Sequence, residues 1–201
     1  FLIMADLITV QEYKNAEGIN GQKEDQRLDI IVPQVSDLAK KYCGTTFVDY
    51  FSSAKTETFS IRDKYTTTII VSESPLVSVE SVKERRTYSE AYQTLTTGSY
   101  EYYVDIASDS IVRTTDSGSE KYWANGVGSV EIEYKAGYSA APADLKLALF
   151  DLVTYYLKDE HKERRTIAGA TLQNQGTSGV RDNTDFPDHI KRVLDLYRVI
   201  I

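Results

Sequence analysis

The chain has 201 residues, 41% of them hydrophobic, and its 23 basic and 30 acidic side chains give a formal net charge of −7. This length suits a single domain with one full hydrophobic core, and the acidic balance argues against a general nucleic-acid-binding surface. One cysteine excludes an internal disulfide bond, and together with two histidines it provides too few ligands for a structural zinc site.

The start of the chain predicts a short helix and no targeting segment. Residues 1–10 lack the basic lead of a signal peptide and are interrupted by Asp6. Thr9 is a candidate N-cap, because Glu12 three residues later completes a capping-box pattern, and Gly18 ends the helix. No apolar run in the sequence approaches the length that spans a bilayer, so we expect a soluble protein made in a reducing cytosol.

A second helix is expected from Asp25 to Tyr42. Its apolar residues recur at helical spacing, and Gly44 supplies a left-handed stop. Pro33 lies inside this pattern, so the helix is either kinked there or begins anew with Pro33 in its first turn. Cys43 ends the apolar stripe and has no histidine near it in sequence, which favours buried packing over a role as nucleophile.

The region after Gly44 reads as strands and turns. Six segments are rich in Thr, Val, Ile and Tyr and are bounded by turn residues: 56–61, 67–72, 77–85, 100–106, 110–114 and 128–134. Ser108-Asp109 indicates a tight hairpin between the fourth and fifth of them. The 15 tyrosines of the chain fit β-strand propensity and protein interfaces equally well. Gly126-Val127-Gly128 is too short and isolated for a phosphate-binding fingerprint.

Two further helices are expected after the strands. The first runs from Pro142 to Glu160 and is apolar around much of its circumference, so we expect the β insert or another subunit to cover part of it. The candidate intersubunit face of this helix is formed by Leu147, Phe150 and Tyr155. The second starts at Pro187. Residues 166–186 between them show no periodicity and are either a flexible arm that orders on assembly or a plain connection.

These elements predict the fold class α+β, in one domain over residues 1–201. A helical frame of about four helices, formed by residues 1–44 and 137–201, carries a large β-rich insertion, residues 45–136, between its second and third helices. Helices far apart in the chain must then pack together to form the core of the frame, which leaves the insertion as a separate face.

Basic and apolar residues near the end of the chain form a candidate interface with a partner protein or a neighbouring subunit. The residues are Arg164, Arg165, Lys191, Arg192, Tyr197, Arg198, Ile200 and Ile201. The alternative is that basic residues are favoured at helix C-termini and on solvated faces. His161 and His189 lie near carboxylates but are expected to be surface residues of helix ends, so we predict no catalytic site, no metal and no cofactor.

The order of the elements identifies a family. The segments that carry the resemblance are, in chain order, L-I-T-V-Q-E-Y, K-K-Y-C-G-T-T-F, V-E-I-E-Y-K-A-G-Y, P-A-D-L-K-L-A-L-F-D-L-V-T-Y-Y and P-D-H-I-K-R-V-L-D-L-Y-R. In this order, over roughly residues 6–45 and 129–198, they resemble the head-tail connector (adaptor) family of tailed bacteriophages. The chain departs from the compact members of that family in its longer β insert and in Pro33.

The resemblance implies a structural virion protein at the portal vertex, made in the host bacterial cytoplasm. Its partners would be further copies in a twelve-fold ring, the portal protein, the next neck or tail-completion protein, and double-stranded DNA that passes through without sequence-specific binding; no membrane is implied. An acidic ring would repel phosphates from its channel wall, which favours sliding over sticking. Two alternatives remain: a soluble β-rich binding module, adhesin-like or receptor-binding, and a hydrolase that uses the acidic insert.

Overall fold

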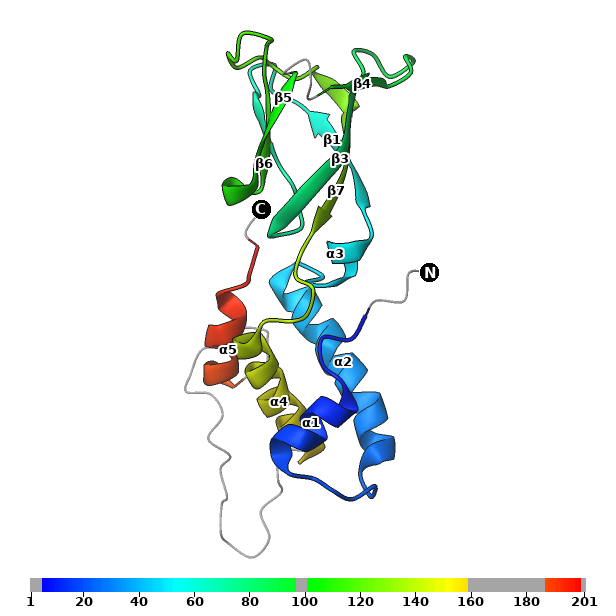
Figure 1. Ribbon diagram of the computed structural model, residues 1–201, viewed down its shortest axis with the longest axis vertical. Helices are drawn as coiled ribbons and strands as arrows, with labels where there is room; N and C mark the ends of the chain where they lie inside the picture. Colours follow the sequence, from blue (N-terminus) through cyan, green and yellow to red (C-terminus); the bar gives the residue numbers. More distant parts are fainter. Residues whose placement is uncertain (1–4, 97–100, 159–186, 200–201) are drawn as a thin grey trace, which may run out of the picture. The chain divides into compact units, whose positions relative to one another are not determined.

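The computed structural model describes residues 5–96, 101–158 and 187–199, which form an α+β protein (Figure 1). The chain divides into two compact units. The helical unit contains the residues up to Gly44 together with those from Ala140 onward, and the β unit is Thr45–Ser139. The fold class that the sequence predicted is therefore confirmed, and each unit is described in turn.

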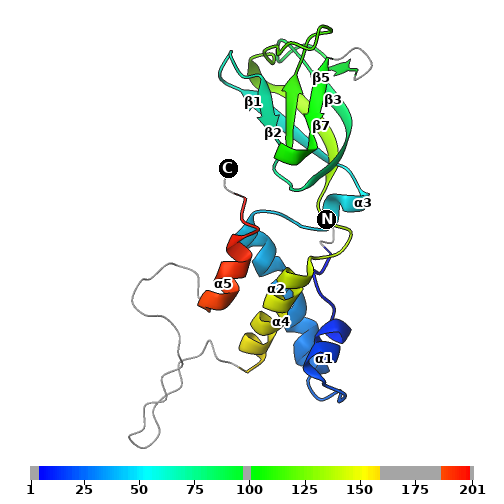
Figure 2. The same ribbon diagram turned by 60° about the vertical axis from the view of Figure 1, so that its left-hand side comes forward.

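Among its described residues the helical unit contains four helices (Figure 2): α1 (Val10–Glu17), α2 (Asp25–Cys43), α4 (Ala143–Leu157) and α5 (Asp188–Asp195). The α2 and α4 helices, distant in sequence, pack against each other, and α5 packs on α4. The capping box of α1 is confirmed, since Thr9 Oγ1 accepts the Glu12 N–H at 3.1 Å and Glu12 Oε2 accepts the Thr9 N–H at 2.8 Å. No helix among the described residues is both long and apolar enough to cross a membrane.

The α2 helix runs through Pro33 as one element from Asp25 to Cys43, so it does not begin anew there. Pro33 is only partly buried, on a helix whose inward stripe includes Leu28 and Val35. Cys43, at the end of that stripe, is fully buried, as the sequence predicted. Burial raises the pKa of its thiol to about 12, which makes the thiol unreactive at neutral pH.

The α4 helix is covered from within the chain. Its inward stripe is fully buried, and on another side Tyr13 of α1 places its ring 6.2 Å from that of Phe150 and its hydroxyl 2.9 Å from Thr154 Oγ1. Lys146 Nζ also bonds Glu12 Oε1 at 2.6 Å. On this side α1 of the same chain covers the helix, and coverage of its remaining apolar surface by another subunit stays a prediction.

The β unit contains one short helix and seven strands among its described residues. These are α3 (Asp49–Ser52), β1 (Lys55–Ile61), β2 (Thr68–Ile70), β3 (Leu76–Glu84), β4 (Gln93–Leu95), β5 (Tyr102–Asp105), β6 (Ser110–Arg113) and β7 (Gly126–Ala136). They form two antiparallel sheets, one of order β1-β7-β3-β4 and one of order β2-β6-β5. The sequence anticipated six of these strands and missed β4 and α3. The expected hairpin joins β5 to β6 through the 3-10 turn η2 (Ile106–Ser108) and Asp109, whose φ is +51°.

The two sheets share one apolar core. It contains Ile61, Ile69, Val71, Leu76, Val82, Leu95, Tyr102, Ile111, Trp123, Val130, Ile132, Tyr134 and Ala136. A buried ion pair also joins the sheets, because Arg113 Nη2 of β6 lies 3.2 Å from Glu84 Oε2 of β3. Glu84 Oε1 accepts the Ala124 N–H at 2.6 Å, so both of its oxygens are bonded.

The chain enters and leaves the β unit through two segments that are hydrogen-bonded to each other. The Tyr138 N–H donates to Phe47 O at 2.6 Å, and Gly137 N–H donates to Pro75 O at 2.8 Å. Gly137 has φ +99°, and a Cβ there would lie 2.2 Å from Phe47 O, so only glycine fits. The buried Glu73 holds the entering segment, since its Oε2 accepts the Thr46 N–H at 2.9 Å.

Candidate interaction surfaces

Tyrosine–aspartate hydrogen bonds fix α5 on the helical unit. Tyr197 Oη donates to the Asp144 carboxylate of α4 at 2.6 and 2.8 Å, and Tyr42 Oη of α2 donates to Asp195 Oδ1 at 2.5 Å. The Arg198 guanidinium lies 5.6 Å from the centre of the Tyr42 ring. The chain after α5 is thereby held against both α2 and α4.

These contacts change the ionisation of their partners. The hydrogen bond from Tyr197 lowers the pKa of Asp144, because it stabilises the carboxylate. Burial, followed by the hydrogen bond to Asp195, raises the pKa of Tyr42 to about 12. Both groups therefore keep their bonded forms, phenol and carboxylate, throughout the neutral pH range.

The structure describes only four of the eight residues of the predicted basic interface. Arg164, Arg165, Ile200 and Ile201 lie outside the described residues. The remaining four lie on α5 or just after it: Lys191 is half-buried, Arg192 and Arg198 are exposed, and Tyr197 is half-buried. Tyr197 and Arg198 follow the end of α5 at Asp195, so they do not lie on the helix itself.

The three residues predicted to form one face of α4 point in different directions. Phe150 lies beside Tyr13 of α1, whereas Tyr155 packs edge-on against Tyr156 with ring centres 5.4 Å apart. Leu147 is 64% exposed. It lies on the strip of α4 between the positions that contact α1 and those that contact α5, by the 100° step of the helix. Leu147 is therefore the member of the set that presents apolar surface to solvent.

The histidine that the structure describes shows no catalytic arrangement. His189 Nε2 lies 3.8 Å from Asp151 Oδ2, and both side chains are at least half exposed. His161 lies outside the described residues. Within the described part of the chain, no group of three or more His, Cys, Asp or Glu side chains could hold a metal ion.

The outer face of the four-stranded sheet is polar and internally paired. Lys83 Nζ lies 2.7 Å from Glu131 Oε1, and Ser81 Oγ donates to Glu133 Oε2 at 3.2 Å. The hydrogen bond from Lys83 to Glu131 raises the pKa of Lys83, so Lys83 stays charged. The polar side chains of this face remain hydrated, so burying the face against an apolar partner would contribute little binding free energy.

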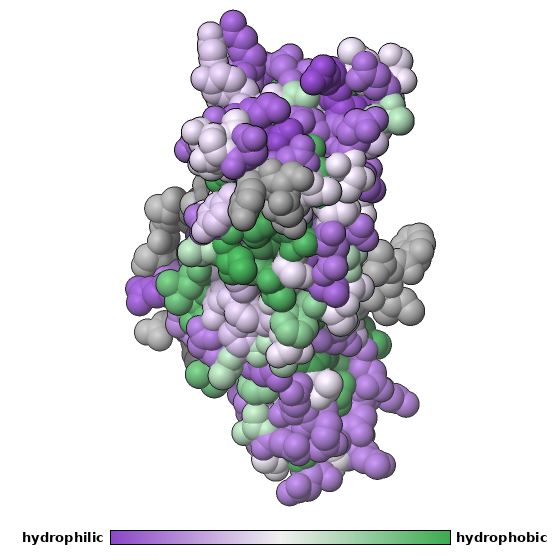
Figure 3. All heavy atoms as spheres, turned by 45° about the horizontal axis from the view of Figure 1, so that its top comes forward, coloured by the Kyte–Doolittle hydropathy of each residue, from purple (hydrophilic) through white to green (hydrophobic). Residues whose placement is uncertain are grey.

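The outer face of the three-stranded sheet exposes apolar and aromatic side chains beside the polar Thr68 and Asp105. Ile70 of β2 is 68% exposed and Tyr103 of β5 is 60% exposed, with Val112 of β6 between their strands. The sequence contained a signal for this face in the doublets Ile69-Ile70 and Tyr102-Tyr103. Adjacent residues on a strand point to opposite faces, so one member of each doublet must face outward. On the side of the molecule shown in Figure 3, hydrophilic side chains cover most of the surface and hydrophobic ones occupy a smaller area.

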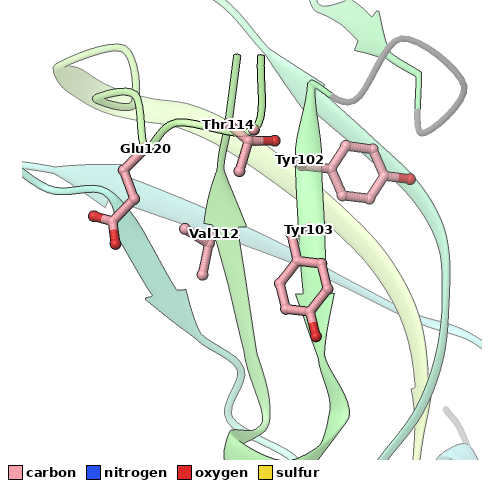
Figure 4. Close-up of a pocket in the computed structure, with 6 residues that line it drawn as sticks. Tyr102, Tyr103, Val112, Thr114 and Glu120 are labelled. Atoms are coloured by element: carbon pink, nitrogen blue, oxygen red, sulfur yellow. The ribbon is translucent and has the colours of Figure 1, made fainter. Parts of the chain in front are cut away.

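A pocket of about 350 Å³ opens on this apolar face (Figure 4). It is lined by Tyr102, Tyr103, Val112, Thr114, Gly118 and Glu120. Val112 lies between the side chains of Glu120 and Tyr103, which come from opposite sides of the pocket (Figure 4). No residue of this pocket was a candidate in the sequence, because only the pairing of β5 with β6 brings its two sides together.

Comparison with known proteins identifies the family. The sequence model of the head completion protein family matches residues 6–200. The head completion protein of Escherichia phage T5 is 24% identical over 196 residues, which cover 96% of this chain and 98% of that protein.

Solved structures resemble this fold over almost the whole chain. A chain from the neck of an empty GTA (gene transfer agent) particle computed with C6 symmetry has a TM-score of 0.58 and 16% identity, and the match covers 97% of this chain and 91% of that chain. A chain from the neck of the native particle computed with C12 symmetry has a TM-score of 0.55 and 14% identity, with 100% and 97% covered.

The family match includes the helical unit and the β unit alike, and the segments singled out in the sequence all lie within it. Solved chains that this fold resembles come from the necks of gene transfer agent particles. The chain therefore belongs to the head completion protein family, and its role is that of a structural head-to-tail connector.

Proposed function

We propose that this chain is one subunit of a twelve-fold ring beneath the portal of a phage particle. The observation that carries the proposal is the family match over residues 6–200. Six- and twelve-fold symmetry in the necks that contain chains of this fold supports a ring of twelve copies. In such a ring the protein links the capsid to the tail and lines part of the DNA channel.

The partners follow from this position. They are the portal protein, the next neck or tail-completion protein, and double-stranded DNA that passes without sequence-specific binding. The net charge of −7 supports passage, because an acidic wall repels phosphates. The protein is made in the host bacterial cytoplasm and remains in the virion, where it needs no cofactor, metal or catalytic group.

A cyclic ring joins two different surfaces of each subunit, so the contacts are heterologous. We assign one of these surfaces to Leu147 of α4 and its surroundings. The basic side chains Lys191, Arg192 and Arg198 are assigned to contact with an acidic surface of the portal or of a neighbour. Charge complementarity of this kind steers association and fixes register.

The alternative, a soluble β-rich binding module carried on helices, is not favoured. A module of that kind needs only its β domain to be shared with relatives. The family match instead spans the helical and β units together, which indicates one conserved assembly role for the whole chain.

Electron microscopy of the purified protein, with and without its cognate portal, tests the proposal. We expect twelve-fold rings on the portal in the wild-type sample. An Arg192→Glu variant should occupy fewer portals, because it reverses an exposed charge beside the portal surface. Lys23→Glu reverses an equally exposed charge before α2 and serves as the matched control. Single copies, or attachment elsewhere on the particle, would contradict the proposal.

A further inference from the structure

The two outer faces of the β unit differ in what they can bind. On the four-stranded sheet the charged side chains are bonded to one another, as with Lys83 and Glu131. On the three-stranded sheet Ile70 and Tyr103 are exposed beside a pocket. Exposed aromatic residues beside a hollow are typical of protein interfaces, where large rings fill contact area at low entropic cost. The apolar face is therefore the better candidate for a partner.

The pocket on that face has walls of different chemistry. Tyr103 forms one side with its ring, Val112 lies between, and Glu120 forms the other side with its carboxylate (Figure 4). Glu120 is the single charged residue of the lining. Its side chain is exposed and makes no ion pair or hydrogen bond with any residue that the structure describes. A carboxylate and an aromatic ring that line one pocket can both attract a cation.

The charge of the β unit favours the same ligand. Residues 45–139 carry 9 basic and 14 acidic side chains, a net charge of −5. Four of those basic side chains are already in ion pairs, namely Lys55, Lys83, Arg113 and Lys135. Two β units would repel each other, so the β unit of a second copy is a poor occupant, and nucleic acid is excluded by the same sign of charge.

We infer that this pocket binds the lysine or arginine side chain of an extended, otherwise apolar segment of a different neck protein. The cation lies between the Glu120 carboxylate and the Tyr103 ring, and the apolar neighbours of the cationic residue cover Val112 and Ile70. The identity of the partner as a neck protein rests on the proposed function. The chemistry of the pocket does not depend on it.

Titration of the full-length, nitrogen-15-labelled chain with a small probe tests the pocket. The probe is acetyl-Val-Arg-Val-amide, and its comparison is the same peptide with neutral citrulline in place of arginine. We expect saturable shifts of the backbone amide signals of Val112, Gly118 and Glu120 with the arginine peptide. Citrulline should weaken binding at least fivefold, because it keeps the shape of arginine and removes the charge.

Two variants distinguish a specific effect of the Glu120 carboxylate from a general effect of the negative charge of the β unit. Glu120→Gln should weaken binding of the arginine peptide at least fivefold, whereas Glu90→Gln, an exposed glutamate elsewhere in the β unit, should leave it unchanged. The inference would be overturned if the two peptides bound equally well or if both variants lost the same affinity. It would also be overturned if the signal shifts were confined to other residues, and that result would point to a different surface.

Ring formation on the portal shows whether a negative result contradicts the inference about the pocket or the proposed function. Glu120→Gln should form rings as the wild type does, since the pocket is assigned to a different partner. Absence of rings in the wild type, with arginine binding intact, would overturn the ring proposal alone. Loss of rings in Glu120→Gln would assign the pocket to contact between copies and overturn the choice of partner.

Discussion

At the scale of single residues, Gly137 determines whether the two segments that lead into and out of the β unit can lie together. Its backbone is in the left-handed region, at φ +99°, and the Phe47 carbonyl occupies the place of a side chain. Phe47 is itself fully buried with φ +64°, an unusual conformation for a bulky residue. The local geometry is therefore set by two residues that are far apart in sequence.

Replacement of Gly137 by alanine should destabilise the protein by roughly 1–3 kcal/mol, through backbone strain and displacement of Phe47. Urea denaturation followed by circular dichroism measures the change. Gly21→Ala is the control, because a Cβ at Gly21 meets no atom within 4 Å and its φ is ordinary. Equal stability of the two variants would show that the close approach to Phe47 is not maintained in solution.

A second residue-scale prediction concerns pH. The ion pair with Lys146, foremost, lowers the pKa of Glu12, so the folded state binds the proton more weakly than the unfolded state. The resulting stabilisation is complete above the unfolded pKa, about 4, and is lost as pH falls through the lower folded value. Because the pair is partly exposed, we expect less than about 1 kcal/mol.

Denaturation at pH 7, 5 and 3 of wild type and Glu12→Gln measures this contribution. The wild type should lose more stability than the variant between pH 5 and 3, since glutamine does not titrate. Glu17→Gln, on the same helix but exposed, is the control and should follow the wild type. Parallel curves for wild type and Glu12→Gln would exclude a contribution from the Lys146 pair.

At the scale of elements, α5 is a helix of eight residues whose hydrogen bonds to the other helices lie at its C-terminal end. Its buried side chains are Ile190 and Leu194, and hydrogen bonds from Tyr197 and to Asp195 fix the turn after it. An isolated helix of this length is unstable in water, so α5 depends on these tertiary contacts. Local opening of α5 should therefore be sensitive to loss of a single bond.

Tyr197→Phe should increase amide hydrogen exchange at Val193 and Leu194 severalfold, because it removes both bonds to Asp144. Tyr103→Phe is the control, since the Tyr103 hydroxyl bonds no described residue. Exchange should stay unchanged in α2 of either variant. An identical exchange rate at α5 in wild type and Tyr197→Phe would show that apolar packing alone holds the helix.

Elements differed in how far the sequence predicted them. The ends of α1 and α2 depend on Thr9, Gly18 and Gly44, which act locally, so the sequence was sufficient for them. The edge strand β4 has no alternating pattern over Gln93–Leu95 and exists through its pairing with β3, which is a distant contact. The pocket beside Glu120 depends on strand register in the same way, and no local pattern encodes it.

At the scale of the whole molecule, function depends on assembly of many copies. The helical unit covers most of α4 itself, through α1, α2 and α5. Among the described residues of α4, Leu147 is exposed and Phe150 and Tyr155 are half-buried, and the intersubunit face that the sequence suggested for these three stays a prediction. Specific contacts in a ring then rest on few side chains, which is usual for interfaces with energetic hot spots.

Leu147→Asp should reduce ring formation on the portal at least tenfold without unfolding the chain, because it places a charge at a desolvated contact. Mass photometry of mixtures with portal, together with circular dichroism of the free chain, measures both effects. Ile30→Asp is the control, since Ile30 is similarly exposed on α2. Rings that tolerate Leu147→Asp as well as Ile30→Asp would remove Leu147 from the interface.

The paired entry and exit segments of the β unit have a mechanical consequence. Tension applied to the chain between the two units enters through Thr45 and Ser139 at once, because both covalent connections lie at these positions. The bond from Tyr138 N–H to Phe47 O joins the two tethers, so they bear load in parallel. A pull that separates the two units is therefore shared between two backbones, and neither one peels away alone.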